Sequence, residues 1–116
     1  MRIEIICQRL MKADKTFSVR TLLYNDSFEP VAIFRNLFVG PNLKMLFPHE
    51  FLFPLSVEGT FGMPESPLVL QPFTFYGRER EFNDLLPGKF EVSAFYEINV
   101  EQKIFNTETF EVLQSM

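Results

Sequence analysis

The stretch Leu85-Leu86-Pro87-Gly88-Lys89-Phe90-Glu91-Val92-Ser93-Ala94-Phe95-Tyr96 decides the fold. Every second side chain from Phe90 to Val100 is apolar. Because successive side chains of a strand point to opposite faces, this alternation predicts a strand with one buried face. Pro87-Gly88 favours a sharp turn just before that strand. The face predicted to be buried holds Phe90, Val92, Ala94, Tyr96, Ile98 and Val100. We therefore expect half-buried antiparallel strands.

The rest of the chain alternates strands with turns, and none of it is predicted to be helical. Eight prolines interrupt it, and no window of about twelve residues repeats at helical spacing. Turn residues include Gly40-Pro41-Asn42 and Asn25-Asp26-Ser27. Such short strands predict one all-β domain spanning residues 1–116, an antiparallel β-sandwich of about seven to nine strands. The predicted strands cover residues 2–10, 16–24, 31–38, 43–47, 51–57, 68–75, 78–82, 89–100 and 103–113.

The turn of the last hairpin decides which residues of its second strand face the core. A two-residue turn at Glu101-Gln102 would turn Phe105 inward and bury Glu111. A turn centred on Gln102 instead pairs Ala94 with Phe110 and Val92 with Val112, which are all apolar. We predict the second arrangement, in which Phe95 and Phe105 point outward from adjacent strands.

A second ambiguity of register precedes this hairpin. Phe73 and Phe75 are odd-numbered and Phe82 is even-numbered, so one continuous register cannot bury all three. Gly77 is therefore predicted to form a β-bulge. The stretch Arg78-Glu79-Arg80-Glu81 puts one sign of charge on each face, which is typical of an edge strand protected from foreign pairing.

Two stretches resemble the immunoglobulin-like sandwiches of bacterial proteins. Residues 24–31, Tyr-Asn-Asp-Ser-Phe-Glu-Pro-Val, are similar to the Asn-x-Ser turn followed by Pro-Val in that superfamily. Residues 85–92, Leu-Leu-Pro-Gly-Lys-Phe-Glu-Val, resemble the Leu-x-Pro-Gly-x-Tyr-x-Val start of a late strand, with Phe90 at the tyrosine position. This resemblance implies an immunoglobulin-like fold over about residues 16–113. The Asn-x-Ser turn and Leu70-Gln71-Pro72 also resemble the intracellular proteinase inhibitors of bacilli.

The composition argues against several classes of function. The net charge of −4 disfavours nucleic-acid binding, which needs a clustered basic face. No apolar run is long enough to span a bilayer, and we expect a bacterial, cytoplasmic protein without membrane contact. His49 has Phe53, not a second histidine, four residues later, and Cys7 lies in an apolar strand. We therefore predict no enzymatic activity, no catalytic residues, no metal and no cofactor.

The aromatic composition points instead to surface contacts. The chain holds fifteen phenylalanines and no tryptophan, more than a compact domain can easily hide. We predict a protein-interaction or assembly module that binds a protein partner or forms a homodimer. A protease inhibitor using an extended proline-bearing loop and a carrier of a small apolar ligand are the alternatives. The interface candidates are Phe95, Phe105, Phe47, Phe51 and Phe53. The loop candidates are Gly62, Met63, Pro64, Glu65, Ser66 and Pro67.

Overall fold

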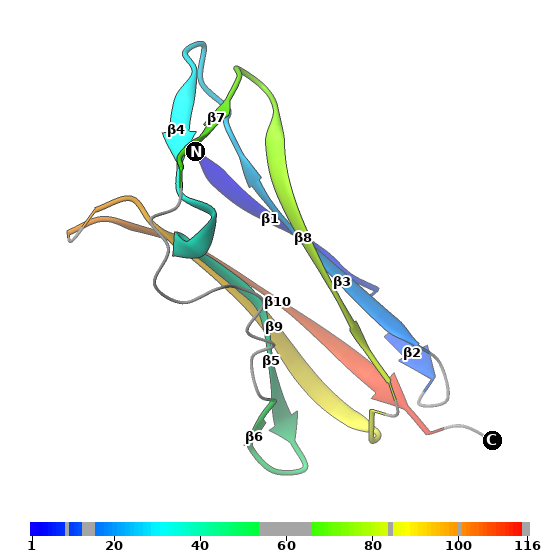
Figure 1. The fold of residues 1–116 in the computed structure, drawn as a ribbon. Coiled ribbons are helices and arrows are strands. Elements are labelled where there is room, and N and C mark those ends of the chain that lie inside the picture. Colours follow the sequence, from blue (N-terminus) through cyan, green and yellow to red (C-terminus); the bar gives the residue numbers. More distant parts are fainter. Residues whose placement is uncertain (9, 13–15, 54–65, 84, 100, 115–116) are drawn as a thin grey trace.

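The strands of the computed structural model form three sheets (Figure 1). Residues 1–8, 10–12, 16–53, 66–83, 85–99 and 101–114 are described. One sheet has the order β1-β3-β8, a five-stranded sheet has the order β2-β10-β9-β5-β6, and β4 pairs with β7. The pairing is antiparallel except between β2 and β10, which are parallel. The strands are β1 (Arg2–Ile6), β2 (Leu10–Lys12), β3 (Phe17–Tyr24), β4 (Val31–Ile33), β5 (Phe38–Phe47), β6 (Phe51–Leu52), β7 (Leu68–Leu70), β8 (Phe75–Phe82), β9 (Gly88–Glu97) and β10 (Lys103–Leu113).

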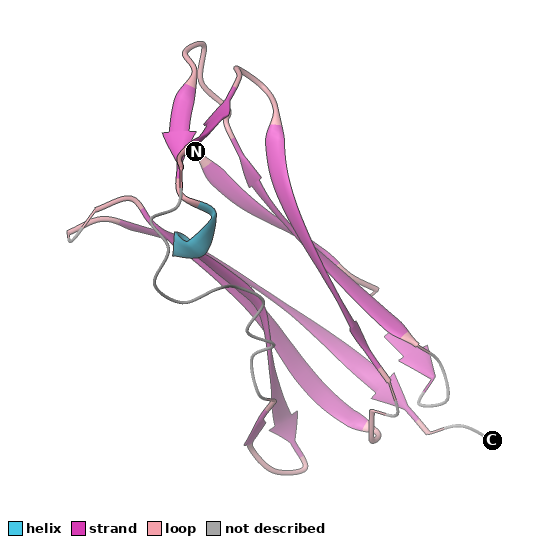
Figure 2. Ribbon diagram, viewed as in Figure 1, coloured by secondary structure: helices cyan, strands magenta, loops and turns pink. Residues whose placement is uncertain are grey.

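The predicted all-β class is confirmed. Strands dominate the described chain, and its one helical element is the 3-10 turn η1 (Arg35–Leu37) (Figure 2). In β9 the alternation holds residue by residue, because Phe90, Val92, Ala94 and Tyr96 are buried and the residues between them are not. The first predicted strand, residues 2–10, is divided: β1 pairs with β3, whereas β2 joins the other sheet beside β10.

The prediction of a strand over residues 31–38 followed by a turn at Gly40-Pro41-Asn42 is wrong. The chain leaves β4 for η1 and then enters β5, which runs straight through residues 40–42. Pairing with β9 is interrupted between Val39 and Asn42, where β5 holds one residue more than the opposite stretch of β9, so this residue forms an irregularity within the strand. Gly40 has a φ of 136°, and a Cβ there would lie 2.7 Å from the Cβ of Ala94. Glycine is needed at this point because β5 passes so close to β9.

Gly77 does not form the predicted bulge. β8 pairs with β3 without interruption from Phe75 to Phe82, and Gly77 lies opposite Leu22. A Cβ on Gly77 would be only 3.0 Å from Cδ2 of Leu22, so the glycine makes room for that leucine. The predicted strand over residues 68–75 ends at Leu70 instead, and a turn separates it from β8. Phe73 and Phe75 are exposed and only Phe82 is buried, so no change of register is needed.

The parity predicted for the last hairpin is confirmed, but the predicted pairs are wrong by four residues. Phe110 lies opposite Phe90, not Ala94. The turn is longer than expected and begins at Ile98, whose N–H donates to the carbonyl of Gln102 at 2.9 Å. In this register the rings of Phe90 and Phe110 stack, with centroids 5.2 Å apart and planes at 7°.

Two apolar clusters hold the sheets together. In the larger one, the ring of Phe17 on β3 lies 4.3 Å from the ring of Phe110 on β10, measured between centroids. This contact joins the three-stranded sheet to the five-stranded sheet. The larger cluster contains Met11, Phe17, Val19, Leu43, Met45, Phe82, Leu85, Phe90, Val92, Phe110 and Val112. The second contains Ile3, Leu23, Ile33, Phe38, Leu70, Ala94 and Tyr96.

Replacing Phe110 with alanine should lower the free energy of unfolding by about 3–5 kcal/mol, because it leaves a cavity between the sheets. Phe105→Ala on the opposite face of the same strand is the matched control and should cost less than about 1 kcal/mol. Urea denaturation followed by circular dichroism measures both. If both variants lost the same free energy of unfolding, the assignment of Phe110 to the buried face of β10 and of Phe105 to its exposed face would be wrong.

Candidate functional site

The most regular group of uncovered apolar side chains lies on the outer face of the five-stranded sheet, the face turned away from the three-stranded sheet. Val39 on β5 is paired with Phe95 on β9, and Phe95 is paired with Phe105 on β10. These three side chains form what we call the apolar row. Phe105 is 61% exposed, and Val39 and Phe95 are half-buried. The Nζ atom of Lys103 lies 4.2 Å from the centroid of the Phe95 ring. The row therefore runs straight across three adjacent strands.

The surroundings of the apolar row are polar but electrically balanced. Ser93 and Thr107 are paired on the side of the row away from the hairpin turn. On the other side, Lys103 forms an ion pair with Glu97 at 3.7 Å. Charged side chains of both signs occur in equal number on the outer face of β5, β9 and β10. They are Lys44, Lys89, Lys103, Glu91, Glu97 and Glu111.

The other predicted interface residues lie around the β5–β6 turn and do not form a single patch. Phe47 is 63% exposed, whereas Phe53 is half-buried and packs against the larger cluster. The ring centroid of Phe53 is 6.2 Å from that of Phe90 and 5.0 Å from that of Phe51. Phe53 thus contributes mainly to the core. The predicted loop site falls on residues 62–65, outside the described residues, and on Ser66 and Pro67, which are exposed.

The edge strand β8 carries charged side chains that oppose pairing with a strand of another chain. Its arginines face the other sheet: Arg78 donates to the carbonyl of Arg35 at 2.9 Å, and Arg80 to that of Pro41 at 3.4 Å. Glu79 and Glu81 are exposed. The pKa of Glu79 is lowered, chiefly because the hydroxyl of Ser18 donates to its carboxylate. Inward-pointing charges discourage the addition of a foreign strand.

The described residues hold no group of side chains that could ligate a metal ion. No cluster of three or more His, Cys, Asp or Glu side chains occurs among them. His49 is exposed in the β5–β6 turn, and Cys7 is half-buried beside the larger cluster. A groove of about 370 Å³ on the outer face is lined by Leu46, Lys89, Thr109, Phe110 and Glu111. Lys89 and Glu111 lie opposite each other on neighbouring strands in this groove.

Sequence reasoning missed an aromatic tip formed by Phe28 and Phe73. Phe28 is 87% exposed, and its ring meets that of Phe73 edge to face, with centroids 5.2 Å apart. Phe73 has a φ of 61°, a region that bulky residues rarely occupy. The two residues lie 45 positions apart in two turns, so no local pattern could have paired them. The only signal was an aromatic residue in each of two proline-bearing turns.

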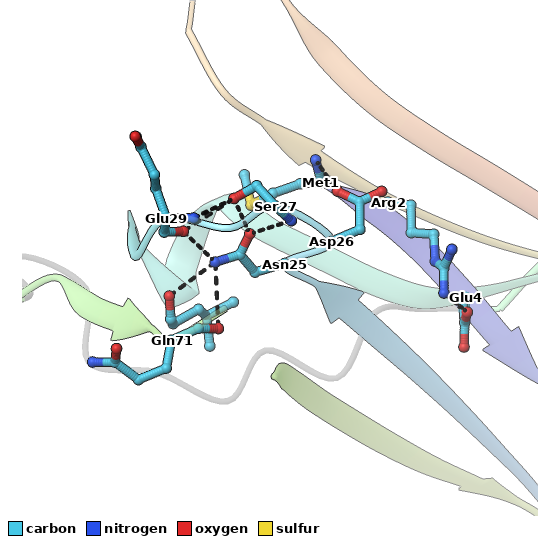
Figure 3. A network of polar contacts seen from close by, with 9 residues as sticks. Met1, Arg2, Glu4, Asn25, Asp26, Ser27, Glu29 and Gln71 are labelled. Atoms are coloured by element: carbon cyan, nitrogen blue, oxygen red, sulfur yellow. Dashed lines mark hydrogen bonds and ion pairs between the residues drawn. The ribbon is translucent and has the colours of Figure 1, made fainter. Parts of the chain in front are cut away.

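A buried asparagine holds these two turns together (Figure 3). The Nδ2 of Asn25 donates to the carbonyls of Glu29 at 2.9 Å, Leu70 at 3.0 Å and Gln71 at 3.3 Å. Its Oδ1 accepts from the backbone N–H and the hydroxyl of Ser27, at 3.1 and 2.7 Å. The Asn-x-Ser sequence is thus a turn, as predicted, and its side chains bond the nearby backbone.

The neighbouring residue ties the turn to the start of the chain. Asp26 accepts from the amino group of Met1 at 3.0 Å (Figure 3). This hydrogen bond is the main reason why the pKa of Asp26 is lowered. The carboxylate is therefore charged over the whole neutral range.

No family model, curated protein or solved structure matches this chain. Within the described residues, no helix is long and apolar enough to cross a membrane. The function is therefore inferred from the structure itself.

Asn25→Ala should lower the free energy of unfolding by about 1–3 kcal/mol, because it removes the amide that donates to the buried carbonyl of Leu70. The control is Asn83→Ala, which removes only an exposed side-chain acceptor of the Thr16 hydroxyl and should cost less than about 0.5 kcal/mol. Urea denaturation measures both changes. A loss for Asn25→Ala as small as that of the control would contradict the structural role of the buried amide.

Proposed function

We propose that this chain is a non-catalytic protein-interaction module whose contact surface is the apolar row. The single observation that supports it is the placement of Val39, Phe95 and Phe105 side by side on the outer face. Isolated exposed apolar residues are ordinary on protein surfaces. Val39, Phe95 and Phe105 are instead aligned across three adjacent strands, and apolar groups of this kind favour binding to another protein.

The proposed architecture is an immunoglobulin-like sandwich. The constant-type immunoglobulin fold has strands A, B, E and D in one sheet and C, F and G in the other. The order β1-β3-β8 fits strands A, B and E, and the order β10-β9-β5 fits strands G, F and C. The packing of Phe17 against Phe110 supports this arrangement, because it is a contact between the three-stranded and the five-stranded sheet.

The rigidity of the surface also supports an interaction function. β9 is flanked on both sides by long partners, β5 and β10, so its outward side chains are held by two ladders of hydrogen bonds. A preorganised surface loses little conformational entropy when it binds. The inhibitor and ligand-carrier alternatives have no comparable observation behind them in the described residues.

The test compares tagged wild type with Phe105→Thr in clarified extract of the source cells, by size-exclusion chromatography. Threonine removes the ring but keeps a side chain that favours strands. Wild type should elute in an assembly larger than the 13.6 kDa monomer, and Phe105→Thr should elute as the monomer. The control Phe28→Thr removes a ring that is even more exposed but lies outside the apolar row. It should elute in the same assembly as wild type.

The melting temperature supplies the second readout. Because Phe105 is largely exposed, Phe105→Thr should shift it by only a few degrees. Elution of Phe105→Thr in the same assembly as wild type would contradict the proposal. A variant that unfolds would show that the row supports the fold rather than binding.

A further inference from the structure

We infer that the protein partner docks as an extended strand on the free edge of β10, and that this strand carries a lysine or arginine that pairs with Glu108. The inference rests on the proposed function, because Phe105 lies both in the apolar row and on this edge. It adds the way in which the partner binds and the side chain that the partner must supply.

The edge of β10 is covered over only part of its length. β9 lies along one side of β10, and β2 pairs with residues 111–113 on the other side. No described strand lies beside residues 103–110 on that side. The apolar row ends here, at the largely exposed ring of Phe105. An uncovered edge presents N–H and C=O groups to which a strand of another protein can add.

The backbone groups of three residues point to this edge. The N–H of Thr107 donates to Oδ1 of its neighbour Asn106 at 2.9 Å, so it is not directed at β9. In an antiparallel pair of strands, the residues that bond the partner strand alternate with residues that do not. The N–H and C=O groups of Phe105 and Thr109 therefore point to the edge as well. The side-chain amide of Asn106, whose Nδ2 donates to the carbonyl of Ile3 at 2.8 Å, bonds Thr107 as the backbone of a neighbouring strand would.

The free part of β10 lacks most of the features that protect the other edges from pairing. The edge strand β8 has arginines that face the other sheet, and β5 contains Pro41 and an irregularity. β10 contains neither proline nor glycine, and its register with β9 is continuous. Thr107 and Thr109 also favour an extended backbone. The one protecting feature of this edge is the charge of Glu108.

Glu108 selects which strand can be added. It is paired with the buried Val92, so its side chain lies on the inner face of the sheet. There it lines a cleft of about 240 Å³ together with Ile5, Ile6 and Cys7. None of the ion pairs between described residues includes its carboxylate. An inward charge opposes the addition of most strands. A strand with a lysine or arginine beside Glu108 gains an ion pair instead, and the aliphatic part of that side chain covers the two isoleucines.

The experiment is a nuclear magnetic resonance titration of the labelled full chain with the peptide acetyl-Thr-Val-Thr-Lys-Thr-Val-Thr-amide, up to about millimolar concentration. The peptide alternates as a strand does, and its central lysine can lie beside Glu108. Binding should slow hydrogen exchange at the amides of Phe105 and Thr109. A matched peptide with glutamate in place of lysine should bind about tenfold more weakly at low salt.

Two changes in the protein test the two parts of the contact. Glu108→Gln keeps the shape of the side chain but removes its charge, so the lysine and glutamate peptides should bind it equally well. Thr109→Pro removes an N–H from the edge and none from the bonds with β9, and it should weaken binding of the lysine peptide by about tenfold or more. Thr109→Val keeps that N–H and should bind as wild type does. Melting curves confirm that each variant is folded.

Equal binding of the two peptides to wild type, or no slowing of exchange at Phe105 and Thr109, would overturn the inference. Slow exchange at these amides that grows with protein concentration, in the absence of peptide, would also overturn it, because a second copy would then cover the edge. The outcome is separable from that of the proposed function. An assembly in extract that is lost in Phe105→Thr but kept in Thr109→Pro would reject the added strand and keep the apolar row. Peptide binding at the edge together with an assembly that does not depend on Phe105 would reject the apolar row and keep the edge.

Discussion

The contact between Phe17 and Phe110 is the constraint on which the rest of the structure depends. It joins the two larger sheets, and the stacking of Phe110 on Phe90 fixes the register of β10 against β9. Since side chains alternate along a strand, burying the even-numbered residues of both strands turns the odd-numbered ones outward. Phe95 and Phe105 are therefore placed opposite each other by the same contact that builds the core. The candidate binding surface is a consequence of core packing.

The far end of the molecule is held by polar contacts instead. There the β3–β4 and β7–β8 turns leave several backbone carbonyls close together, and the side chain of Asn25 satisfies three of them. An unpaired buried carbonyl is costly. This amide therefore helps to fix how the two turns meet, together with two backbone bonds, from the N–H of Asn25 to the carbonyl of Thr74 and from the N–H of Phe73 to the carbonyl of Asn25. The exposed ring of Phe28 and the unusual backbone of Phe73 both depend on that meeting.

The alternation of residues 89–100 predicted the strand β9, its buried face from Phe90 to Tyr96 and the outward direction of Phe95 and Phe105. It was wrong at its end, because β9 stops at Glu97 and Ile98 is 40% exposed. It could not predict the pairing, because every shift by an even number of residues buries the same faces. The true register brings Phe110 to Phe90, a pairing that only the packing against Phe17 decides. Likewise, Gly40-Pro41-Asn42 reads as a turn locally, but its close approach to Ala94 places it inside β5. The aromatic tip was missed because it joins residues from two separate turns.

The packing of Phe110 fixes both the core and the outward direction of Phe95 and Phe105. The most direct measurement is a nuclear Overhauser experiment on the folded chain. The account predicts contacts from the ring of Phe110 to the rings of Phe17 and Phe90. Contacts from Phe110 to Ala94 in place of Phe90, or none to Phe17, would contradict it.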